Sequence, residues 1–316
     1  MTLTDDQRSF FDRNGYLVVQ DALSPARLTA LRAEYSDLLD KLYAAWQAAG
    51  LVPPGDGMDF WGKLSAAYAA GCDWFQPMDL SLPGGQIAPD TPMHFGPAAF
   101  DMITDAHLLD IVQDLIGPEI TSNPIQHIRI KPPQAQVRQT EDRVHVTVTD
   151  WHQDRGVTHA EADGTTMLTV WLAITDVTAE SAPLQVIPGV HRGDLIEHCG
   201  WAQTGIPKAL IPTDRAVALP CPAGAAILFH PLTPHASLPN ASDRYRWSFD
   251  IRYSQTGQPT GRSHFPHFVA RSRTHPETEL KDWRTWRDMW VQARARLSDQ
   301  PHIPIHRWDT SSPVCA

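Results

Sequence analysis

The chain has 316 residues, of which 42% are hydrophobic and 20% are charged, ordinary values that argue against extensive disorder. Its net charge of -10 argues against a nucleic-acid-binding surface, which needs clustered Lys and Arg, and favours a small-molecule substrate. The acidic start lacks the pattern of a secretion signal and no apolar run approaches a bilayer span, so we expect a cytoplasmic protein without a membrane partner.

The four cysteines are scattered, at Cys72, Cys199, Cys221 and Cys315. None forms a C-x-x-C pair, so the spacing suggests neither a zinc ribbon nor a disulfide framework. We therefore expect all four to be reduced thiols.

Residues 1–50 predict a helix, a strand and a second helix. The first helix has Thr4 as its N-cap and ends at Gly15, and residues 16–23 have the composition of a strand. The second helix follows Ser24 as cap, with Pro25 at its first position. We expect it to pack on the outside of a sheet.

Residues 51–119 are rich in Gly, Pro, Trp and Met, and predict a partly irregular cover with one short helix near residues 66–70. Aromatic and polar residues of this cover are candidates to line a substrate pocket. These are Trp74, Phe75, Met93, His94 and Phe95.

Residues 120–255 consist of short β-branched and aromatic runs separated by turn residues, the pattern of an antiparallel barrel or sandwich. The predicted strands are "IQHIRIKPP", "HVTVTDWHQD", "TMLTVWLAITD", "PLQVIPGVH", "AVALP", "AAILFHP" and "RYRWSFDIRY". Residues 256–316 predict a loop and an amphipathic helix whose Trp283, Trp286 and Trp290 serve packing. We find no internal repeat or flexible linker, so the prediction is one domain over residues 1–316, mainly β with flanking helices.

His152 and Asp154 lie two apart in the predicted strand "HVTVTDWHQD", so both point to one face. His-x-Asp alone is weak evidence in a chain with 15 His. His230 and His235 are candidates for a third ligand. Two His and one carboxylate, with other positions open, suit non-haem Fe(II) that reacts with O2.

Arg246 and Ser248 also lie two apart, and the aromatic residues that alternate with them are expected to face the helices. A guanidinium inside the barrel needs an anionic partner, and a dicarboxylate cofactor supplies one through paired hydrogen bonds. The alternative is a structural ion pair of Arg246 with Asp243 or Asp250. Arg252 is a competing candidate for the carboxylate.

These residues carry a family resemblance: the chain resembles the phytanoyl-CoA dioxygenase family of Fe(II)/2-oxoglutarate-dependent oxygenases. The matching stretches occur in the family's order. They are "LTDDQRSFFDRNGYLVVQDALSPARLTALR", "IRIKPP", "WHQD", "TVWLAITDVTAESAPLQVIPGVHRG" and "FHPLTPHASLPNASDRYRWSFDIRY".

The resemblance implies a double-stranded β-helix, also called a jelly roll, of the cupin-like type. It also implies that His152, Asp154 and His235 hold Fe(II), because "HASLPN" matches the family's H-x-S-x-x-N pattern around its distal ligand. Arg246 takes the place of the arginine that binds the distal carboxylate of 2-oxoglutarate. The remaining cofactor-binding candidates are Ser248, Trp171, Gln126 and Lys131.

The implied reaction uses O2 to hydroxylate, or otherwise oxidise, an unactivated carbon of a small molecule, while 2-oxoglutarate becomes succinate and CO2. The resemblance also implies oxygenation rather than halogenation, because related halogenases replace the carboxylate of Asp154 by a small residue. One departure is visible: the family's usual E-N-G reads Glu180-Ser181-Ala182 here.

Two other functions remain open from the sequence: a cupin-like metal-dependent isomerase or hydrolase that does not use 2-oxoglutarate, and a non-catalytic jelly-roll binding protein. Arg129 and Arg155 are candidates to meet an anionic substrate, and Trp151 is expected with Arg155 at the rim of the iron pocket. The sequence makes no prediction of the oligomeric state.

Overall fold

The computed structural model describes residues 2–139, 141, 143, 146–305 and 307–316. The α-helices are α1 (Asp5–Asn14), α2 (Pro25–Ala48), α3 (Phe60–Ala69), α4 (Phe75–Met78), α5 (Pro97–Ile103), α6 (Ala106–Ile116) and α7 (Trp283–Ser298). The strands are β1 (Tyr16–Val19), β2 (Ile120–Lys131), β3 (Met167–Ala173), β4 (Leu184–Val186), β5 (Cys199–Gly200), β6 (Thr204–Gly205), β7 (Val217–Leu219), β8 (Ala226–Phe229), β9 (His235–Ser237), β10 (Arg246–Gln255) and β11 (Phe268–Arg271).

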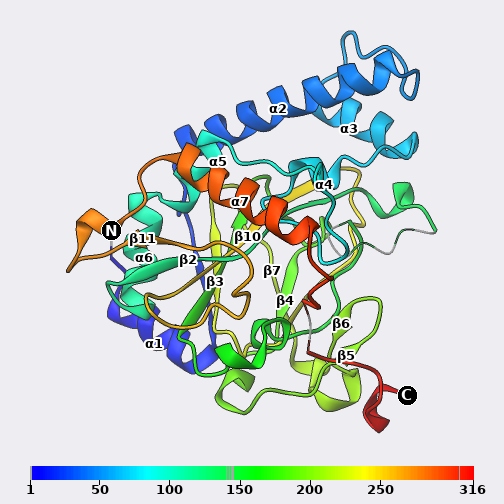
Figure 1. Cartoon of the computed structure of the whole chain (residues 1–316). Coiled ribbons are helices and arrows are strands. Elements are labelled where there is room, and N and C mark those ends of the chain that lie inside the picture. Colours follow the sequence, from blue (N-terminus) through cyan, green and yellow to red (C-terminus); the bar gives the residue numbers. More distant parts are fainter. Residues whose placement is uncertain (1, 140, 142, 144–145, 306) are drawn as a thin grey trace.

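The strands form antiparallel sheets with helices around them (Figure 1), which confirms the predicted jelly-roll class. The main sheet has six strands in the order β1-β8-β3-β10-β2-β11. A smaller sheet has the order β7-β4-β9, and β5 pairs with β6. The division into one domain stays a prediction.

The outer face of the main sheet is apolar and packs against the helices. Every second residue of β10, from Trp247 to Tyr253, belongs to the largest hydrophobic cluster, together with the outward residues of β2 and β3. α2, α5, α6 and α7 contribute to the same cluster. Burial of this face supplies much of the favourable free energy of folding.

The inner face of the main sheet is mixed. Trp171 of β3 and Phe229 of β8 pack in a second hydrophobic cluster with Leu184 and Val186 of the smaller sheet. The neighbouring strands β2 and β10 instead place buried charged side chains on this face. Buried charged side chains therefore lie between the two sheets, next to the second hydrophobic cluster.

The two N-terminal helices are confirmed, whereas the strand between them is shorter than predicted, because β1 ends at Val19 and not at residue 23. Thr4 caps α1 in a capping box and Gly15 ends it with φ of 76°. Ser24 caps α2, with Pro25 in the first turn.

The cover contains more helix than predicted, since α3 to α6 all lie within residues 51–119. α3 begins six residues before the predicted short helix, where Asp59 accepts a hydrogen bond from Gly62 N and provides the N-cap. At the other end of the chain, the predicted loop contains β11, which extends the main sheet. Trp286 and Trp290 of α7 are buried, as expected for packing residues.

The predicted strand over residues 145–154 is wrong where the structure describes it, and residue 145 lies outside the described residues. Residues 146–151 form no strand, and Asp154 begins a 3-10 turn, Asp154–Val157. The strand pattern was misleading because this segment bonds mostly to side chains and loops. Only His152 makes a bridge, to His235 of β9.

The prediction of four reduced thiols is also wrong in part. Cys199 and Cys315 form a disulfide across 116 residues, whereas Cys72 and Cys221 are free and buried. Sequence spacing failed here because the fold brings together two cysteines from distant segments. The bond ties the C-terminal tail to β5.

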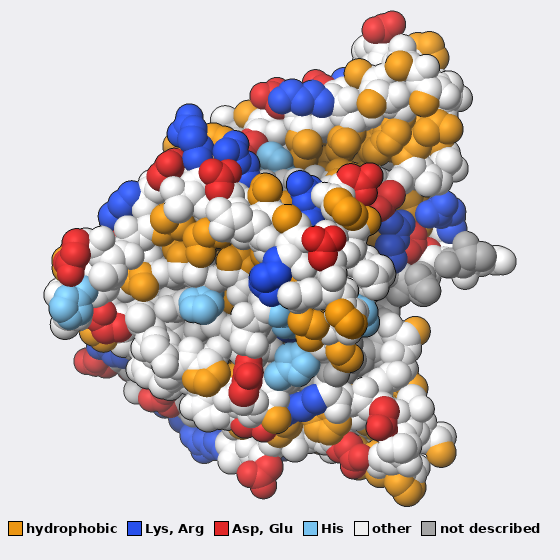
Figure 2. Space-filling view, viewed as in Figure 1, with side chains coloured by type: hydrophobic (Ala, Val, Ile, Leu, Met, Phe, Trp, Pro, Cys, Tyr) orange, Lys and Arg blue, Asp and Glu red, His pale blue; other side chains and the backbone are white. Residues whose placement is uncertain are grey.

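On the face of the molecule in Figure 2, acidic and basic side chains are interspersed with apolar ones. This face therefore offers no continuous basic surface. Among the described residues, no helix is long and apolar enough to cross a bilayer.

Candidate metal centre and its two cavities

His152, Asp154 and His235 come together at the inner face of the sheets. One ligand atom from each lies within 4.8 Å of the others, and all three residues are buried. The two imidazole Nε2 atoms lie 3.8 Å (His152) and 3.9 Å (His235) from the Asp154 carboxylate. This is the two-histidine, one-carboxylate set that suits non-haem Fe(II).

The backbone explains how a short segment and β9 bring the histidines together. His152 N donates to His235 O (3.0 Å) and His235 N donates to His152 O (2.9 Å). The ring of His235 also stacks on Phe229, with centroids 4.7 Å apart. The imidazoles are therefore positioned by main-chain pairing and packing.

Both imidazoles present Nε2 to the site. His152 Nδ1 lies 2.8 Å from Asp150 O and His235 Nδ1 lies 3.0 Å from Thr233 O. A carbonyl oxygen only accepts, so Nδ1 carries the proton and Nε2 keeps its lone pair. Burial, and then the nearby His235, lower the pKa of His152 to about 3, which keeps it neutral.

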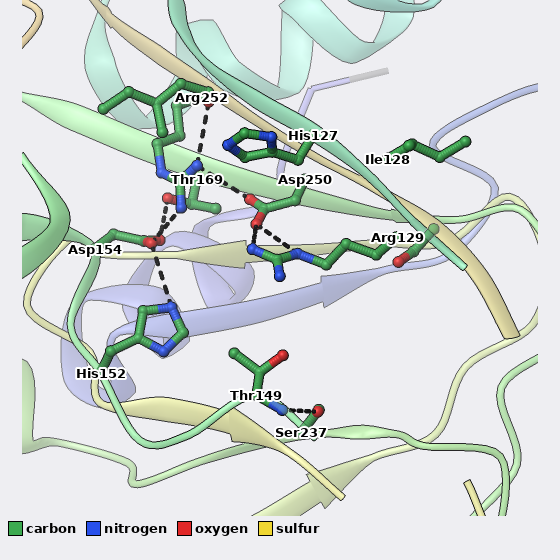
Figure 3. Close-up of polar contacts among 12 residues, drawn as sticks. His127, Ile128, Arg129, Thr149, His152, Asp154, Thr169, Ser237, Asp250 and Arg252 are labelled. Carbon is green, nitrogen blue, oxygen red and sulfur yellow. Dashed lines mark hydrogen bonds and ion pairs between the residues drawn. The ribbon is translucent and has the colours of Figure 1, made fainter. Parts of the chain in front are cut away.

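Asp154 is fully buried and held from two sides (Figure 3). Arg252 donates to one carboxylate oxygen and Thr169 to the other. Burial raises the pKa of Asp154, but Arg252 and the two histidines lower it by more. The pKa of Asp154 is therefore well below its usual value. The carboxylate is ionised and oriented, as a metal ligand requires.

Gln153, between two ligands in sequence, fixes the irregular segment. Its side chain donates to Leu232 O (2.8 Å) and accepts from Ile196 N (2.7 Å), and its backbone N donates to His198 Nε2 (2.9 Å). Gly156 packs directly against His198, where no larger residue fits, because a Cβ at Gly156 would lie 2.3 Å from the His198 ring. These contacts, rather than pairing in a strand, hold the backbone around Gln153 in place.

A small interior cavity, the inner cavity, extends from the triad to Arg246. It is lined by Arg129, Thr149, His152, Thr169, Trp171, Leu184, Phe229, His235, Ala236, Arg246 and Asp250. Two of the predicted cofactor-binding residues, Trp171 and Arg246, therefore share a cavity with two of the predicted ligands.

Arg246 is completely buried, and among the described residues it has no acidic partner. Its Nη1 donates to Ser248 Oγ (2.6 Å), and its guanidinium lies over the ring of Trp171 at 5.2 Å. Nε and Nη2 have no hydrogen-bond partner in the described part of the chain. Burial, and then Arg129, lower the pKa of Arg246 to about 9.

The structural ion pair that the sequence left open for Arg246 is absent among the described residues. Asp250 instead pairs with Arg129 (2.7 Å) and Arg252 (3.3 Å). Arg252, the competing candidate for the distal carboxylate of 2-oxoglutarate, forms ion pairs with Asp154 and Asp250 instead. A buried guanidinium without an anion is costly, so the geometry around Arg246 fits a carboxylate ligand.

Lys131 places a buried amine close to Arg246, its partner across the sheet. Its Nζ donates to Ser237 Oγ (2.6 Å) and Thr149 Oγ1 (3.0 Å). Burial, and then the charge of Arg246, lower the pKa of Lys131 well below its usual value. Sequence reasoning missed Ser237 and Thr149 as partners, although Ser237 lies two residues after a ligand in the same strand and so shares its face.

Gln126 is placed differently from the other candidates. It is buried, and its side-chain amide donates to Leu80 O (2.9 Å). Like Lys131 and Ser248, it is absent from the lining of the inner cavity, but unlike Lys131 it lies on the face of β2 opposite to Arg129, because residues of a strand alternate between faces. We leave it out of the cofactor site.

A larger cavity of about 460 Å³, the outer pocket, opens on the other side of His152. Its lining includes Phe75, Leu82, Ile125, Arg252, Arg262 and Ile305. Of the cover residues named as pocket candidates, Phe75 lies here, whereas Trp74 is in the core and Met93, His94 and Phe95 line a hollow between α2 and α7. A still larger hollow beside α2 and α3 is lined by none of the triad residues. The volume of a cavity therefore does not identify the one that serves the metal centre, whereas the presence of His152 in its lining does.

Trp151 and Arg155 do not line the outer pocket, contrary to expectation. Trp151 packs in a small separate cluster, and Arg155 donates to the carbonyl oxygens of Ala162 and Thr165. His230, the rejected ligand, packs against His191 with ring centroids 5.1 Å apart.

The departure at Glu180-Ser181-Ala182 has a structural counterpart. Ala182 has φ of 53°, a left-handed conformation that glycine adopts without strain and alanine does not. The change affects a turn and leaves the triad in place.

The family model for phytanoyl-CoA dioxygenase matches residues 81–248. A probable phytanoyl-CoA dioxygenase of Caenorhabditis elegans is 24% identical over 264 residues, which cover 80% of this chain and 75% of that protein. The L-proline trans-4-hydroxylase of Streptomyces griseoviridis is 30% identical over 148 residues, covering 39% of this chain and 55% of the hydroxylase.

Solved structures with the same fold include the non-haem monooxygenase ThoJ, with a TM-score of 0.60 and 19% identity over 93% of this chain and 98% of that one. EctD from S. alaskensis, solved with 2-oxoglutarate and 5-hydroxyectoine, has a TM-score of 0.54 and 19% identity, and the match covers 81% of this chain and 77% of EctD. At these identities the likeness establishes the jelly-roll fold.

Proposed function

The chain belongs to the phytanoyl-CoA dioxygenase family, and on this premise we propose that it uses Fe(II), 2-oxoglutarate and O2 to hydroxylate, or otherwise oxidise, an unactivated carbon of a small molecule. Membership makes the chain an enzyme of the non-haem iron and 2-oxoglutarate oxygenase class. The proposal concerns the reaction and the residues that carry it.

In this proposal His152, Asp154 and His235 hold Fe(II). Their donor atoms, nitrogen and oxygen without thiolate, suit this ion, and three protein ligands leave positions open for a co-substrate. Arg252 and Thr169 keep the carboxylate oriented, and the carbonyls behind the histidines fix their tautomers.

The observation that carries the assignment of 2-oxoglutarate is the unpaired guanidinium of Arg246 in the cavity that reaches the triad. Arg246 binds the distal carboxylate, with Ser248 orienting the guanidinium. Lys131 adds a buried amine close by, and Trp171 provides a wall. A buried guanidinium that has no acidic partner among the described residues is stabilised by an anionic ligand.

Bound iron and 2-oxoglutarate together supply the activation of O2, with 2-oxoglutarate converted to succinate and CO2. The protein contributes orientation of the ligands and a site sheltered from water by the two apolar clusters. Similarity to the L-proline trans-4-hydroxylase supports hydroxylation of a small molecule as the outcome.

The decisive experiment is a turnover assay with purified protein, Fe(II) and 2-oxoglutarate, in which succinate is measured by mass spectrometry with and without O2. We expect slow, iron- and O2-dependent succinate formation. Asp154→Ala should reduce it by at least about a hundredfold, since it removes a metal ligand. Normal activity of Asp154→Ala would exclude the metal assignment.

The same assay separates the other functions. An isomerase or hydrolase would act on its substrate without O2 or 2-oxoglutarate, and a non-catalytic binding protein would form no succinate. As a readout that needs no turnover, Mn(II) with 2-oxoglutarate should raise the unfolding temperature of the wild type under nitrogen. Asp243→Asn, at an exposed acid that belongs neither to the triad nor to the lining of the inner cavity, serves as the control for Asp154→Ala.

A further inference from the structure

The outer pocket holds a charge that the proposed reaction does not use. Arg262 lines the pocket and is only 5% exposed. Its Nη2 donates to Val157 O (2.7 Å), while its Nε is buried without a hydrogen-bond partner in the described part of the chain. Among the described residues no carboxylate lies within ion-pair distance of it.

The other charged groups of this pocket are already paired. Arg129 and Arg252 share Asp250, and Arg143 bonds to Glu141 (2.7 Å). The acid Asp79 lies 2.8 Å from His127 Nδ1, so it is not available to Arg262. Arg262 is therefore the one guanidinium of the described pocket lining that has no acid within ion-pair distance.

Arg262 is also held firmly in place. It follows Gly261, whose φ is 75° and where a Cβ would meet Thr158 Cβ at 2.6 Å, so the turn packs directly on the segment after the ligands. The lining of the pocket is mixed, and its apolar part includes Phe75, Leu82 and Ile305.

We propose that the outer pocket takes a small carboxylic acid with an apolar body, and that Arg262 binds its carboxylate while the body extends towards the metal centre. The situation parallels that of Arg246 in the inner cavity: each cavity contains one buried guanidinium without an acid, and a planar carboxylate fits its paired N–H groups. This inference rests on the proposed function, because the metal centre defines which pocket is the substrate side. It also replaces Arg129 and Arg155 as the residues that meet an anionic substrate.

The test uses a panel of small carboxylic acids with aliphatic, cyclic and aromatic bodies, each paired with its primary amide, and phosphate monoesters of matching alcohols. Binding is measured by thermal denaturation under nitrogen, with the full chain saturated with Mn(II) and 2-oxoglutarate. Stabilisation by Mn(II) and 2-oxoglutarate is recorded first, so a failure of the proposed function appears in that step alone.

We expect some acids to raise the unfolding temperature and their amides to have no effect. Arg262→Gln should weaken acid binding at least about tenfold and leave the response to 2-oxoglutarate unchanged. Arg244→Gln, an exposed arginine outside the pocket, is the control for the loss of one charge. Arg262→Met should fold with unchanged or higher stability without acid, because it removes an unpaired buried charge.

The inference would be overturned by amides that bind as strongly as the acids, or by acid binding that survives in both Arg262 variants. Binding of the phosphate esters, or a panel in which no acid binds, would overturn it as well. A clear loss of stability in Arg262→Met would show that Arg262 is a structural residue instead.

Discussion

The two faces of β10 are equally buried and chemically opposite. Trp247 and Phe249 on the outer face are 2% and 0% exposed, and Arg246 and Ser248 on the inner face are both 0% exposed. The outer face gains free energy from apolar burial, whereas the inner face has charged groups whose burial is costly. Burial alone therefore does not distinguish a core from a site, but the partners of the buried groups do.

The inner face itself has two parts. Asp250 and Arg252 belong to a network with Arg129 and Asp154, in which each charge meets an opposite one. Arg246 is outside this network: it contacts the hydroxyl of Ser248 and the ring of Trp171, and no acid of the described residues lies within ion-pair distance of it. We expect the first part to stabilise the site and the second to serve the ligand.

Trp247→Ala tests the outer face and should have the largest effect on stability. The indole stacks on Phe60 with centroids 5.5 Å apart and meets Tyr35 edge-on at 5.3 Å. Its loss should reduce the free energy of unfolding by about 3–5 kcal/mol, measured by urea denaturation. Val291→Ala, at a 38% exposed position, should change it by less than about 0.5 kcal/mol. Similar small changes in both variants would contradict the comparison.

Asp250→Asn tests the paired part of the inner face. It leaves Arg129 and Arg252 without their shared acid and should cost about 3 kcal/mol of unfolding free energy. Burial raises the pKa of Asp250, but Arg252 and Arg129 lower it more, so the carboxylate is charged in the native protein. Asp243→Asn on the surface is the matched control, and equal stability of the two variants would show that the network contributes nothing.

Arg246→Met tests the unpaired part and should have the smallest effect on stability. Without a ligand its unfolding free energy should equal or exceed that of the wild type, because an unpaired buried charge is removed. The concentration of 2-oxoglutarate that gives half-maximal thermal stabilisation with Mn(II) should rise at least about tenfold. A loss of stability as large as that of Asp250→Asn, with unchanged 2-oxoglutarate binding, would make Arg246 structural.

Much of this contrast follows from the sequence. Alternation along "RYRWSFDIRY" predicted which residues of β10 face the helices and which face inward, because a strand repeats every two residues. The same alternation places Asp250 and Arg252 on the inner face. Their ion pairs could not be predicted from it, because the partners Arg129 and Asp154 lie on other segments of the chain. The ligand set came from the family resemblance, and the geometry brings those three residues together.

Other features had no readable signal. The backbone around His152 and Asp154 is irregular, since its shape depends on Gln153 and His198 contacts that no local pattern encodes. α3 to α6 were underestimated because short helices in a Gly- and Pro-rich region are stabilised by packing on the sheet. Arg262 lies in a loop without periodicity, and only its burial and its lack of an acidic partner among the described residues distinguish it from an ordinary surface arginine.

The bond between Cys199 and Cys315 closes a covalent ring that contains His235, Arg246 and Arg262, while His152 and Asp154 lie outside it. In a chain-entropy model, a ring of this length removes conformations from the unfolded chain that amount to about 5 kcal/mol. Ile305, which lines the outer pocket, belongs to the tail that the ring holds. A reducing agent in the buffer therefore changes the free energy of unfolding in every stability measurement described above. The oxidised and reduced proteins must be measured separately, because their unfolded chains have different conformational entropies.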